Sequence, residues 1–381
     1  MSAVALSILA VFVGCLLFAL VLGSWTERIR SATEPMNRSV SESRNGRVSH
    51  VVASRNAEAT LVPLLQDLHA QDWPKELIEV IVVDDASSDG TGDIVRSMQR
   101  TWPQLHLCRN VGEGKKAAIT TGVNVASGEF VVLTDADARC GRKRTTLIME
   151  HMEAEGSDLL ILPVHTMAGV GALGRLQEEE QAGLLGMAAG EALLGRPMLA
   201  NGANMAFRKS AFGAVGEFKG DKLASGDDVF LVQRMREAGR RIGCLMDPRV
   251  TVVVQAERTC KGFLAQRLRW AGKMRSVRGL GPWVGLWGVI LPWLLVWRTC
   301  TIRLLDLPKG FGPEMISLLA LSWILWLVPV LMLVRQVRSF LGLSNAWPIS
   351  AFAYLAFCIY SPLIALLALV VRPRWKGRRI S

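Results

Sequence analysis

The sequence predicts an α/β domain with a mainly parallel sheet, flanked by membrane-spanning helices. Apolar, strand-like segments alternate with segments of helical periodicity between residues 48 and 138, a pattern typical of a parallel sheet covered by helices. Residues 3–23 carry no charge, and a bilayer-spanning helix needs roughly 20 such residues. Three more uncharged stretches follow late in the chain, at 279–297, 315–334 and 339–371.

Composition agrees with this division. The chain has 381 residues, is half hydrophobic and carries a net charge of +11. Between the apolar stretches, residues 24–278 are mixed and mostly polar, and roughly 250 residues are ample for one core. The positive charge suits a domain resting on an anionic membrane surface. No nucleic-acid recognition motif is present, so we predict a lipid bilayer and no nucleic acid as partner.

The first apolar stretch has two interpretations, a cleaved signal peptide and an uncleaved anchor. No basic residue precedes Arg28 and the apolar run is long, which favours the anchor. Arg28, Arg30 and the basic middle domain predict a multi-pass protein of the cell (inner) membrane with the domain in the cytoplasm. The seven cysteines are scattered without a CxxC pair, as expected for reduced thiols.

The predicted elements follow in order along the chain. We expect strands within 48–56, 78–91 and 129–138, and helices at 58–71, 92–102 and 115–127. Residues 172–195 also have helical character, and their run of three acids, Glu178 to Glu180, is interpreted as a solvent-exposed face. Ligands of parallel sheets bind at the carboxyl ends of the strands, where two of these strands end in acids.

The acid pair after the third strand is the first candidate site. Asp135 and Asp137 follow the apolar run 130–133, and residues i and i+2 of an extended chain point to the same side. Two close carboxylates repel each other unless a cation lies between them. Mg²⁺ or Mn²⁺, held by one or two carboxylates and a substrate diphosphate, fits such a pair. Solvated loop acids are the alternative.

Three further segments carry candidate residues. Asp84 and Asp85 in "VVDDASSDGT" are predicted to accept hydrogen bonds from a base or ribose, with an Asx turn as the alternative. Residues 112–118, "GEGKKAA", lack the spacing of a phosphate loop, yet Lys115 and Lys116 are placed to face a phosphate or base. Asp228 in "SGDDVFL" is either part of a capping box with Ser225 or a general base at a helix N-terminus.

The last segments adjoin the membrane. Residues 262–275, "GFLAQRLRWAGKMR", form a basic amphipathic helix that suits lipid headgroups. The same helix offers Gln266, Arg269 and Trp270 as a patch for diphosphate and sugar. The basic tail 372–379 predicts a cytoplasmic carboxyl end. That requires two full spans after the domain, either with 279–297 lying in the interface or re-entering, or with 339–371 turning back at Ser361–Pro362.

Taken together, these motifs resemble those of the membrane-bound family 2 glycosyltransferases, such as cellulose, hyaluronan and poly-N-acetylglucosamine synthases. The resemblance covers about residues 48–275 and has seven segments in the family's order: "SRNAEATL" (54–61), "VVDDASSDGT" (82–91), "GKKAA" (114–118), "LTDADA" (133–138), "NGANMAFRKSAF" (201–212), "SGDDVFL" (225–231) and "QRLRW" (266–270).

The resemblance implies a GT-A fold, a nucleotide-sugar donor and a metal ion, Mg²⁺ or Mn²⁺. It implies nucleoside contacts by Asp84 or Asp85, a nucleotide contact by Asp135, the metal on Asp137 and a general base at Asp228. It further implies donor and acceptor binding by the QxxRW residues Gln266, Arg269 and Trp270. Two positions depart from the family and bear on the acceptor: Asp227, where Glu is usual, and Asn201, where polymer synthases often have cysteine.

The predicted activity is transfer of a sugar, from a UDP-sugar by resemblance, to a hydroxyl of a glycan or lipid acceptor. One candidate base without a carboxylate nucleophile favours a single displacement with inversion, by analogy with glycosidases. The alternative is an inactive subunit of an assembly that makes a polysaccharide or glycolipid. The predicted domains are: 1–24, anchor; 25–47, linker; 48–278, catalytic domain; 279–371, membrane region; 372–381, basic tail.

Overall fold

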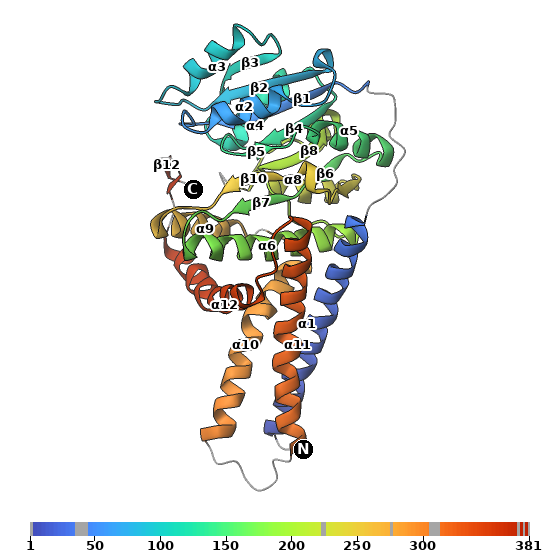
Figure 1. Cartoon of the computed structure of the whole chain (residues 1–381), viewed down its shortest axis with the longest axis vertical. Coiled ribbons are helices and arrows are strands. Elements are labelled where there is room, and N and C mark those ends of the chain that lie inside the picture. The colour runs from blue at the N-terminus through green and yellow to red at the C-terminus, as the bar shows by residue number, and fades with distance from the viewer. Residues whose placement is uncertain are drawn as a thin grey trace.

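The computed structural model describes residues 3–34, 45–221, 226–274, 277–304, 313–371, 374–375 and 378–379. It is an elongated molecule with an α/β domain at one end and a bundle of long helices at the other (Figure 1). The α/β domain is built from these elements: β1 (Val48–Ser54), α2 (Leu61–His69), β2 (Ile78–Asp84), α3 (Thr91–Gln99), β3 (Leu105–Arg109), α4 (Lys115–Val125), β4 (Phe130–Thr134), β5 (Arg139–Cys140), α5 (Arg144–Glu155), β6 (Leu159–Ile161), β7 (Val164–Met167), β8 (Asn204–Arg208), α7 (Lys209–Ala214), α8 (Asp227–Glu237), β9 (Ile242–Cys244) and β10 (Val252–Gln255).

The main sheet has seven strands in the order β3-β2-β1-β4-β8-β6-β9. Strands β1 to β4 are parallel where they pair, whereas β8 runs antiparallel to both β4 and β6. The prediction of a mainly parallel sheet is therefore correct, with β8 as the exception. A second sheet of three strands, β5-β10-β7, lies on the side toward the helical bundle (Figure 1).

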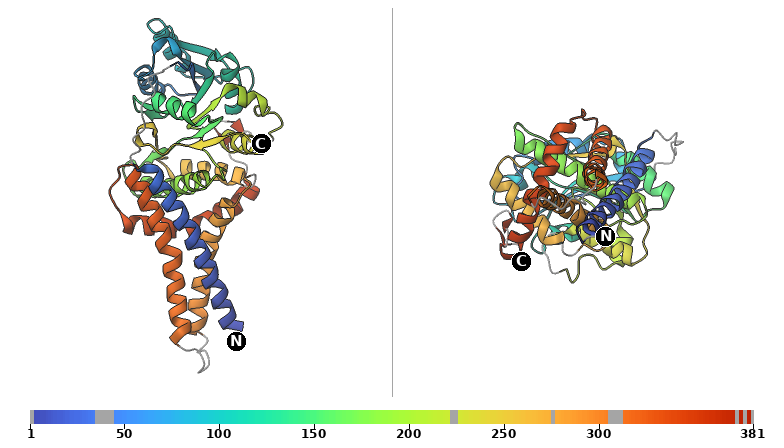
Figure 2. Two further views of the ribbon diagram at one scale, coloured as in Figure 1. Left: turned by 90° about the vertical axis from the view of Figure 1, so that its right-hand side faces the viewer. Right: turned by 90° about the horizontal axis from the view of Figure 1, so that it is seen from below.

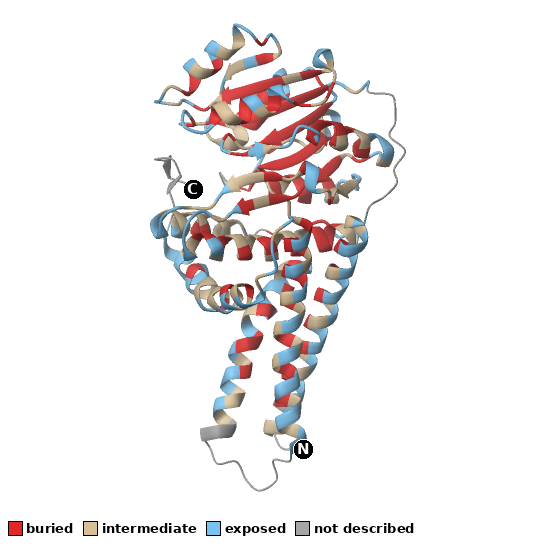
Figure 3. Cartoon of the chain, in the orientation of Figure 1, coloured by how far each residue is buried: buried red, intermediate tan, exposed pale blue. Residues whose placement is uncertain are grey.

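The core of the domain lies on both faces of the main sheet, whose central strands are almost wholly buried (Figure 3), whereas the edge strands β3 and β9 are mostly half-buried or exposed. Alternation of side chains divides them: Val51, Ile81 and Val131 pack with α4, whereas Val52, Val80 and Val82 pack with α2. Helix α4 approaches the sheet closely at Gly122, where a Cβ would lie 2.5 Å from Val51. This close approach fixes the start of α4 near the carboxyl ends of β1 and β2.

The helical part consists of six elements: α1 (Ala3–Thr33), α6 (Ala172–Leu193), α9 (Cys260–Met274), α10 (Gly281–Leu304), α11 (Pro313–Phe340) and α12 (Trp347–Val370). Within the described residues, α1, α10, α11 and α12 are long and apolar enough to cross a membrane. Helices α1, α10 and α11 run along the long axis, whereas α6, α9 and α12 lie across it, between the bundle and the sheet (Figures 1 and 2).

The arrangement of α10 to α12 can be compared with the two chain paths predicted to bring the carboxyl end to the side of the α/β domain. Helix α10 joins the bundle, α11 returns, and α12 stays against α9 and α6, with Pro362 inside the helix. Helix α12 continues through Ser361–Pro362 without turning back, so this predicted path is not observed. The interfacial or re-entrant placement of residues 279–297 stays a prediction. The tail strands β11 (Arg374–Trp375) and β12 (Arg378–Arg379) nevertheless lie on the domain's side (Figure 1); the rest of the tail, and most of the predicted linker, fall outside the described residues.

Helix α6 joins the two parts of the molecule through its glutamates, and the interpretation of Glu178 to Glu180 as a solvated face is wrong. Glu178 pairs with His165 of β7 at 3.1 Å and with Arg338 of α11 at 3.4 Å. Glu179 is buried, pairs with Arg338 and accepts a hydrogen bond from Ser350 of α12 at 2.7 Å. Periodicity alone missed these partners because they come from distant segments.

Candidate active site

Five segments converge at the carboxyl edge of the main sheet: the ends of β2 and β4, the start of β8, and the N-terminal turns of α4 and α8. The pairing registers explain this convergence, since Asp84 lies opposite Ser54 of β1 and Thr134 opposite Asn204 of β8. Helix α9 approaches the same region through Lys273, which pairs with Asp228. The acids predicted from separate motifs therefore meet basic side chains here.

Asp84 and Asp85 organise the loops beside this edge. Asp85 is buried; it accepts hydrogen bonds from Asn110 Nδ2 at 2.7 Å and from the Gly114 amide at 3.1 Å. Asp84 Oδ1 accepts from the Ser87 amide at 3.0 Å, which is the turn expected from the alternative interpretation. Both carboxylates thus have roles within the protein, and their contact with a nucleoside stays a prediction.

Lys115 is the first residue of α4 and bridges two of the acids. Its Nζ lies 2.7 Å from Asp135 Oδ1 and 3.3 Å from Asp227 Oδ2. Burial by itself lowers the pKa of Lys115, but Asp135 and Asp227 outweigh it and raise the pKa above its ordinary value. Lys115 thus faces the acids, and its contact with a phosphate or base stays a prediction, whereas Lys116 pairs with Asp221 at 2.8 Å.

Asp227 and Asp228 begin α8 and are both buried. Lys273 Nζ lies 3.0 and 3.1 Å from the two carboxylate oxygens of Asp228. Burial opposes ionisation of Asp228, yet Lys273 and Lys115 prevail and lower its pKa. Burial raises the pKa of Asp227, whose Oδ2 makes an ion pair but no hydrogen bond among the described residues.

The capping-box interpretation of Asp228 is not supported. Gly226, with φ of 90°, is the N-cap residue of α8, and no side chain caps this end. A capping box places its acid at the third helical position, whereas Asp228 is the second residue of α8. The predicted capping partner Ser225 lies outside the described residues.

Gly202 shows how tightly the centre is packed. A Cβ at this position would lie 2.5 Å from Asp227 Oδ2 and 3.0 Å from Lys115 Nζ. Its amide also points to Asp228 Oδ2 at 3.4 Å. Any side chain here would displace the acids, so the segment "NGANM" supplies a glycine for steric reasons.

A divalent ion could be bound at this edge only by acids that are accessible to solvent. Asp137 is exposed, Asp135 is half-buried and Ala136 between them is buried. The extended geometry expected for this pair is not observed, because β4 ends at Thr134 and a turn follows, in which the Ala138 amide donates to the Asp135 carbonyl at 3.1 Å. Among the described residues no three acidic, histidine or cysteine side chains gather closely enough to hold a metal. One or two carboxylates completed by a substrate diphosphate is the ligand set that Mg²⁺ takes, and Asp137 fits that set.

On α9, the three QxxRW residues are all half-buried. Burial lowers the pKa of Arg269, opposed by the charges of Glu257 and Asp135. Gln266 Oε1 accepts a hydrogen bond from Arg267, whose guanidinium also lies 4.3 Å from the centre of the Trp270 ring.

Two residues at this edge, Lys273 and Arg144, were not predicted as site residues from the sequence. Lys273 follows Gln266 by two helical turns, so the spacing 266, 269, 270 and 273 marks one face of α9. Arg144 is buried and binds Asn204 Oδ1 at 2.8 Å and Thr134 Oγ1 at 3.0 Å, which ties the end of β4 to β8. No local pattern marked Arg144, because its partner Asn204 lies 60 residues away in sequence.

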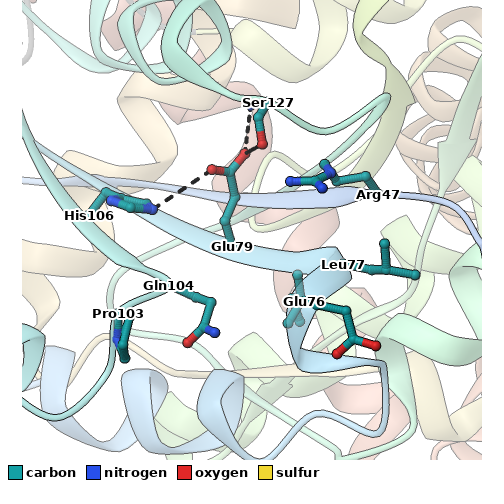
Figure 4. A pocket seen from close by; sticks show the side chains of 9 residues that line it. Arg47, Glu76, Leu77, Glu79, Pro103, Gln104, His106 and Ser127 are labelled. Carbon is teal, nitrogen blue, oxygen red and sulfur yellow. Dashed lines mark hydrogen bonds and ion pairs between the residues drawn. The ribbon is translucent and has the colours of Figure 1, made fainter.

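Two hollows lie outside this centre. The first, of about 240 Å³, is lined by Arg47, Glu76, Glu79, His106 and Ser127 among others. Figure 4 shows Glu79 at its middle, joined to Ser127 and His106; it lies at the amino ends of the strands, opposite the acids. The second, of about 670 Å³, is lined by Lys116, Phe218 and Asp221 among others.

Comparison with known proteins finds similarity to one family of enzymes. The sequence profile described as "Glycosyl transferase family 2" matches residues 49–216. A poly-β-1,6-N-acetyl-D-glucosamine synthase of Staphylococcus epidermidis is 25% identical over 228 residues, which are 59% of this chain and 53% of the relative. One from Staphylococcus aureus is 24% identical over the same shares of the two chains. The chain thus spans about half the length of the curated relatives it matches.

A solved structure has the same fold. The mannosyltransferase PcManGT from Pyrobaculum calidifontis, in complex with GDP-Man and Mn²⁺, aligns with a TM-score of 0.56 at 20% identity, covering 94% of this chain and 98% of that one. The predicted GT-A fold, with flanking apolar helices, is confirmed.

Proposed function

We propose that this chain, a membrane protein with a glycosyl transferase family 2 domain, transfers a sugar from a nucleotide-sugar donor to a hydroxyl of a glycan or lipid acceptor. The observation that carries the proposal is the cluster of Asp135, Asp227 and Asp228 with Lys115 and Lys273 at the carboxyl edge of the sheet. This edge is where α/β folds bind nucleotides.

In this mechanism Asp228 accepts the proton of the acceptor hydroxyl as its oxygen attacks the anomeric carbon. The depressed pKa of Asp228 keeps its carboxylate ionised at neutral pH, so it is in the state that a base requires. With one base and no separate nucleophile assigned, the reaction is a single displacement that inverts the anomeric carbon. Asp227, held by Lys115, borders the acceptor.

The donor is held by groups on both sides of the acids. Asp84 or Asp85 contacts the nucleoside, Asp135 and Lys115 the nucleotide, and the QxxRW residues Gln266, Arg269 and Trp270 the diphosphate and the acceptor sugar. Asp137 would hold Mg²⁺ or Mn²⁺, which when bound neutralises charge on the diphosphate as a Lewis acid. Arginine suits phosphate because its donors are planar and always charged.

The proposed donor sugar is taken from the names of the curated relatives. Because the similar curated proteins are named as poly-β-1,6-N-acetyl-D-glucosamine synthases, UDP-N-acetylglucosamine is the first donor to test, ahead of UDP-hexoses. The acceptor is a glycan or a lipid, and the domain works on the cytoplasmic side of the cell (inner) membrane. We propose the same domain boundaries as from the sequence: a catalytic domain at 48–278 and a membrane region at 279–371.

A donor screen tests the proposal. Membranes containing the wild-type chain are supplied with individual nucleotide-sugars, and the released nucleotide and product mass are measured beside Asp228→Asn membranes. We expect nucleotide release from one donor in the wild type only, and a product that gains one or many sugar units. No release from any donor, with the chain folded and bound to other synthesis proteins, would instead support the inactive assembly subunit.

A further inference from the structure

Arg267 lies within the QRLRW segment, but the family motif assigns it no role. Its side chain is only 4% exposed, and its partner Glu180 of α6 is 5% exposed. Arg267 Nε lies 2.9 Å from each carboxylate oxygen of Glu180, and Nη2 lies 2.6 Å from Oε2. This is the two-pronged geometry that makes an arginine–carboxylate pair both strong and directional.

The same guanidinium contacts two of the three residues that the proposed function assigns to substrate. Its Nη1 donates to Gln266 Oε1, and its Cζ lies 4.3 Å from the Trp270 ring centre and 4.5 Å from that of Phe263. Phe263 and Trp270 stand four residues before and three after Arg267, so all three share one helix face. One buried cation therefore restrains both an amide and an indole.

We propose that Arg267 and Glu180 are positioning residues that hold Gln266 and Trp270 in their substrate-binding orientation. The proposal rests on the proposed function, because it takes these two side chains as ligands of the donor diphosphate and acceptor sugar. Side chains fixed before binding lose less conformational freedom when the substrate arrives. Glu180 fixes the arginine, and the arginine fixes its two neighbours.

Transfer kinetics of single and double variants test the chain of contacts. Glu180→Gln and Arg267→Lys should each raise the acceptor KM about tenfold, within the range for directly coupled neighbours, with a smaller change in kcat. Lysine keeps the charge of Arg267 but has no planar fork. In a Trp270→Ala background, Glu180→Gln should raise the acceptor KM no further, because its effect passes through the indole. Independent, additive effects would overturn the proposal.

Glu179→Gln is the matched control. It removes a buried charge from the adjacent position of α6, but Glu179 contacts Arg338 and Ser350 rather than α9. We expect this variant to lower the melting temperature and leave the acceptor KM unchanged. An equal rise of KM in Glu179→Gln would show that the integrity of α6, and not the orientation of α9 side chains, is responsible.

Hydrogen exchange gives a measurement that needs no activity. Glu180→Gln should speed amide exchange over residues 263–270 of α9, whereas Glu179→Gln should not. If the wild type transfers no sugar while this exchange difference is present, the proposed function fails and the restraint of α9 by Glu180 stands. If transfer is normal and neither KM nor exchange responds to Glu180→Gln, the positioning role fails and the proposed function stands.

Discussion

The acids at the sheet edge and the glutamates of α6 are both groups of acidic side chains, but their ion-pair partners differ. Asp135, Asp227 and Asp228 pair with lysines, whereas Glu179 and Glu180 pair with arginines between helices. Lysine is a compact charge on a flexible stem, and arginine is a rigid fork with several donors. The first group therefore suits exchange of partners when a charged substrate arrives, and the second suits a permanent joint.

The largest effect on transfer is expected at Asp137, the exposed acid of the sheet edge. Asp137→Ala should bring transfer below detection and weaken nucleotide-sugar binding in Mg²⁺ or Mn²⁺, because one carboxylate of the ion's ligand set is lost. Transfer and donor affinity are measured across a metal titration. Asp93→Ala, which alters an exposed acid of α3, is the control and should match the wild type. A folded Asp137→Ala enzyme with normal turnover and metal dependence would disprove the metal site.

Asp228→Asn separates chemistry from structure at the sheet edge. A general base contributes typically 10²- to 10⁴-fold to rate, so turnover should fall by that factor while donor affinity stays nearly unchanged. The melting temperature should fall as well, because Asn removes one charge of the buried ion pair with Lys273. Asn is close to Asp in shape and is well tolerated at helix N-termini. All three quantities are measured on this one variant. Turnover within about threefold of wild type would transfer the role of base to Asp227 as the next candidate.

Lys273→Met tests the lysine side of the comparison through pH. Lys273 helps to lower the pKa of Asp228 against the opposing effect of burial, so its removal should raise that pKa. A base must be deprotonated, and the acid limb of kcat/KM should therefore move to higher pH. The ion pair's stability contribution, present above the ordinary carboxylate pKa and lost as pH falls through the folded value, should shrink as well. An unmoved acid limb would contradict this.

The pair of Glu179 with Arg338 should respond in stability rather than in transfer kinetics. Breaking a buried ion pair by removing one charge costs about 3–5 kcal/mol, so Glu179→Gln should lower the free energy of unfolding by about that amount. Burial itself raises the pKa of Glu179, opposed by Ser350 and Arg338. Denaturation in detergent is the measurement. A decrease in the free energy of unfolding below about 1 kcal/mol, the value for exposed pairs, would mean that the Glu179–Arg338 pair contributes little to stability.

The smallest effect is expected at an exposed pair of the same domain. Asp93 and Arg96 are paired at 2.8 Å but have side-chain exposures of 83% and 61%. Such pairs contribute about 0–1 kcal/mol and are screened by salt, so Asp93→Ala should leave the unfolding free energy almost unchanged. A loss as large as that of Glu179→Gln would show that exposure does not separate the two classes of pair in this protein.

Much of the domain was predictable because its strands are short, apolar and locally patterned. The expected strands at 48–56 and 129–138 are β1 and β4, and the helix expected at 115–127 is α4. The acids at strand ends were predictable too, since parallel strands bring their carboxyl ends to one edge. The antiparallel direction of β8 was not, because strand direction is set by a connection that leaves no mark in the residues of the strand.

The sequence by itself determined where charge and apolar residues lie along the chain, and hence the four apolar helices, the strand-end acids and the basic face of α9. Only the tertiary structure decided which charges meet. It paired Asp228 with Lys273, placed Glu180 against Arg267 and laid α12 across the bundle. The physical reason is that an ion pair depends on the distance between two side chains, and residues far apart in sequence acquire that distance only when the chain folds.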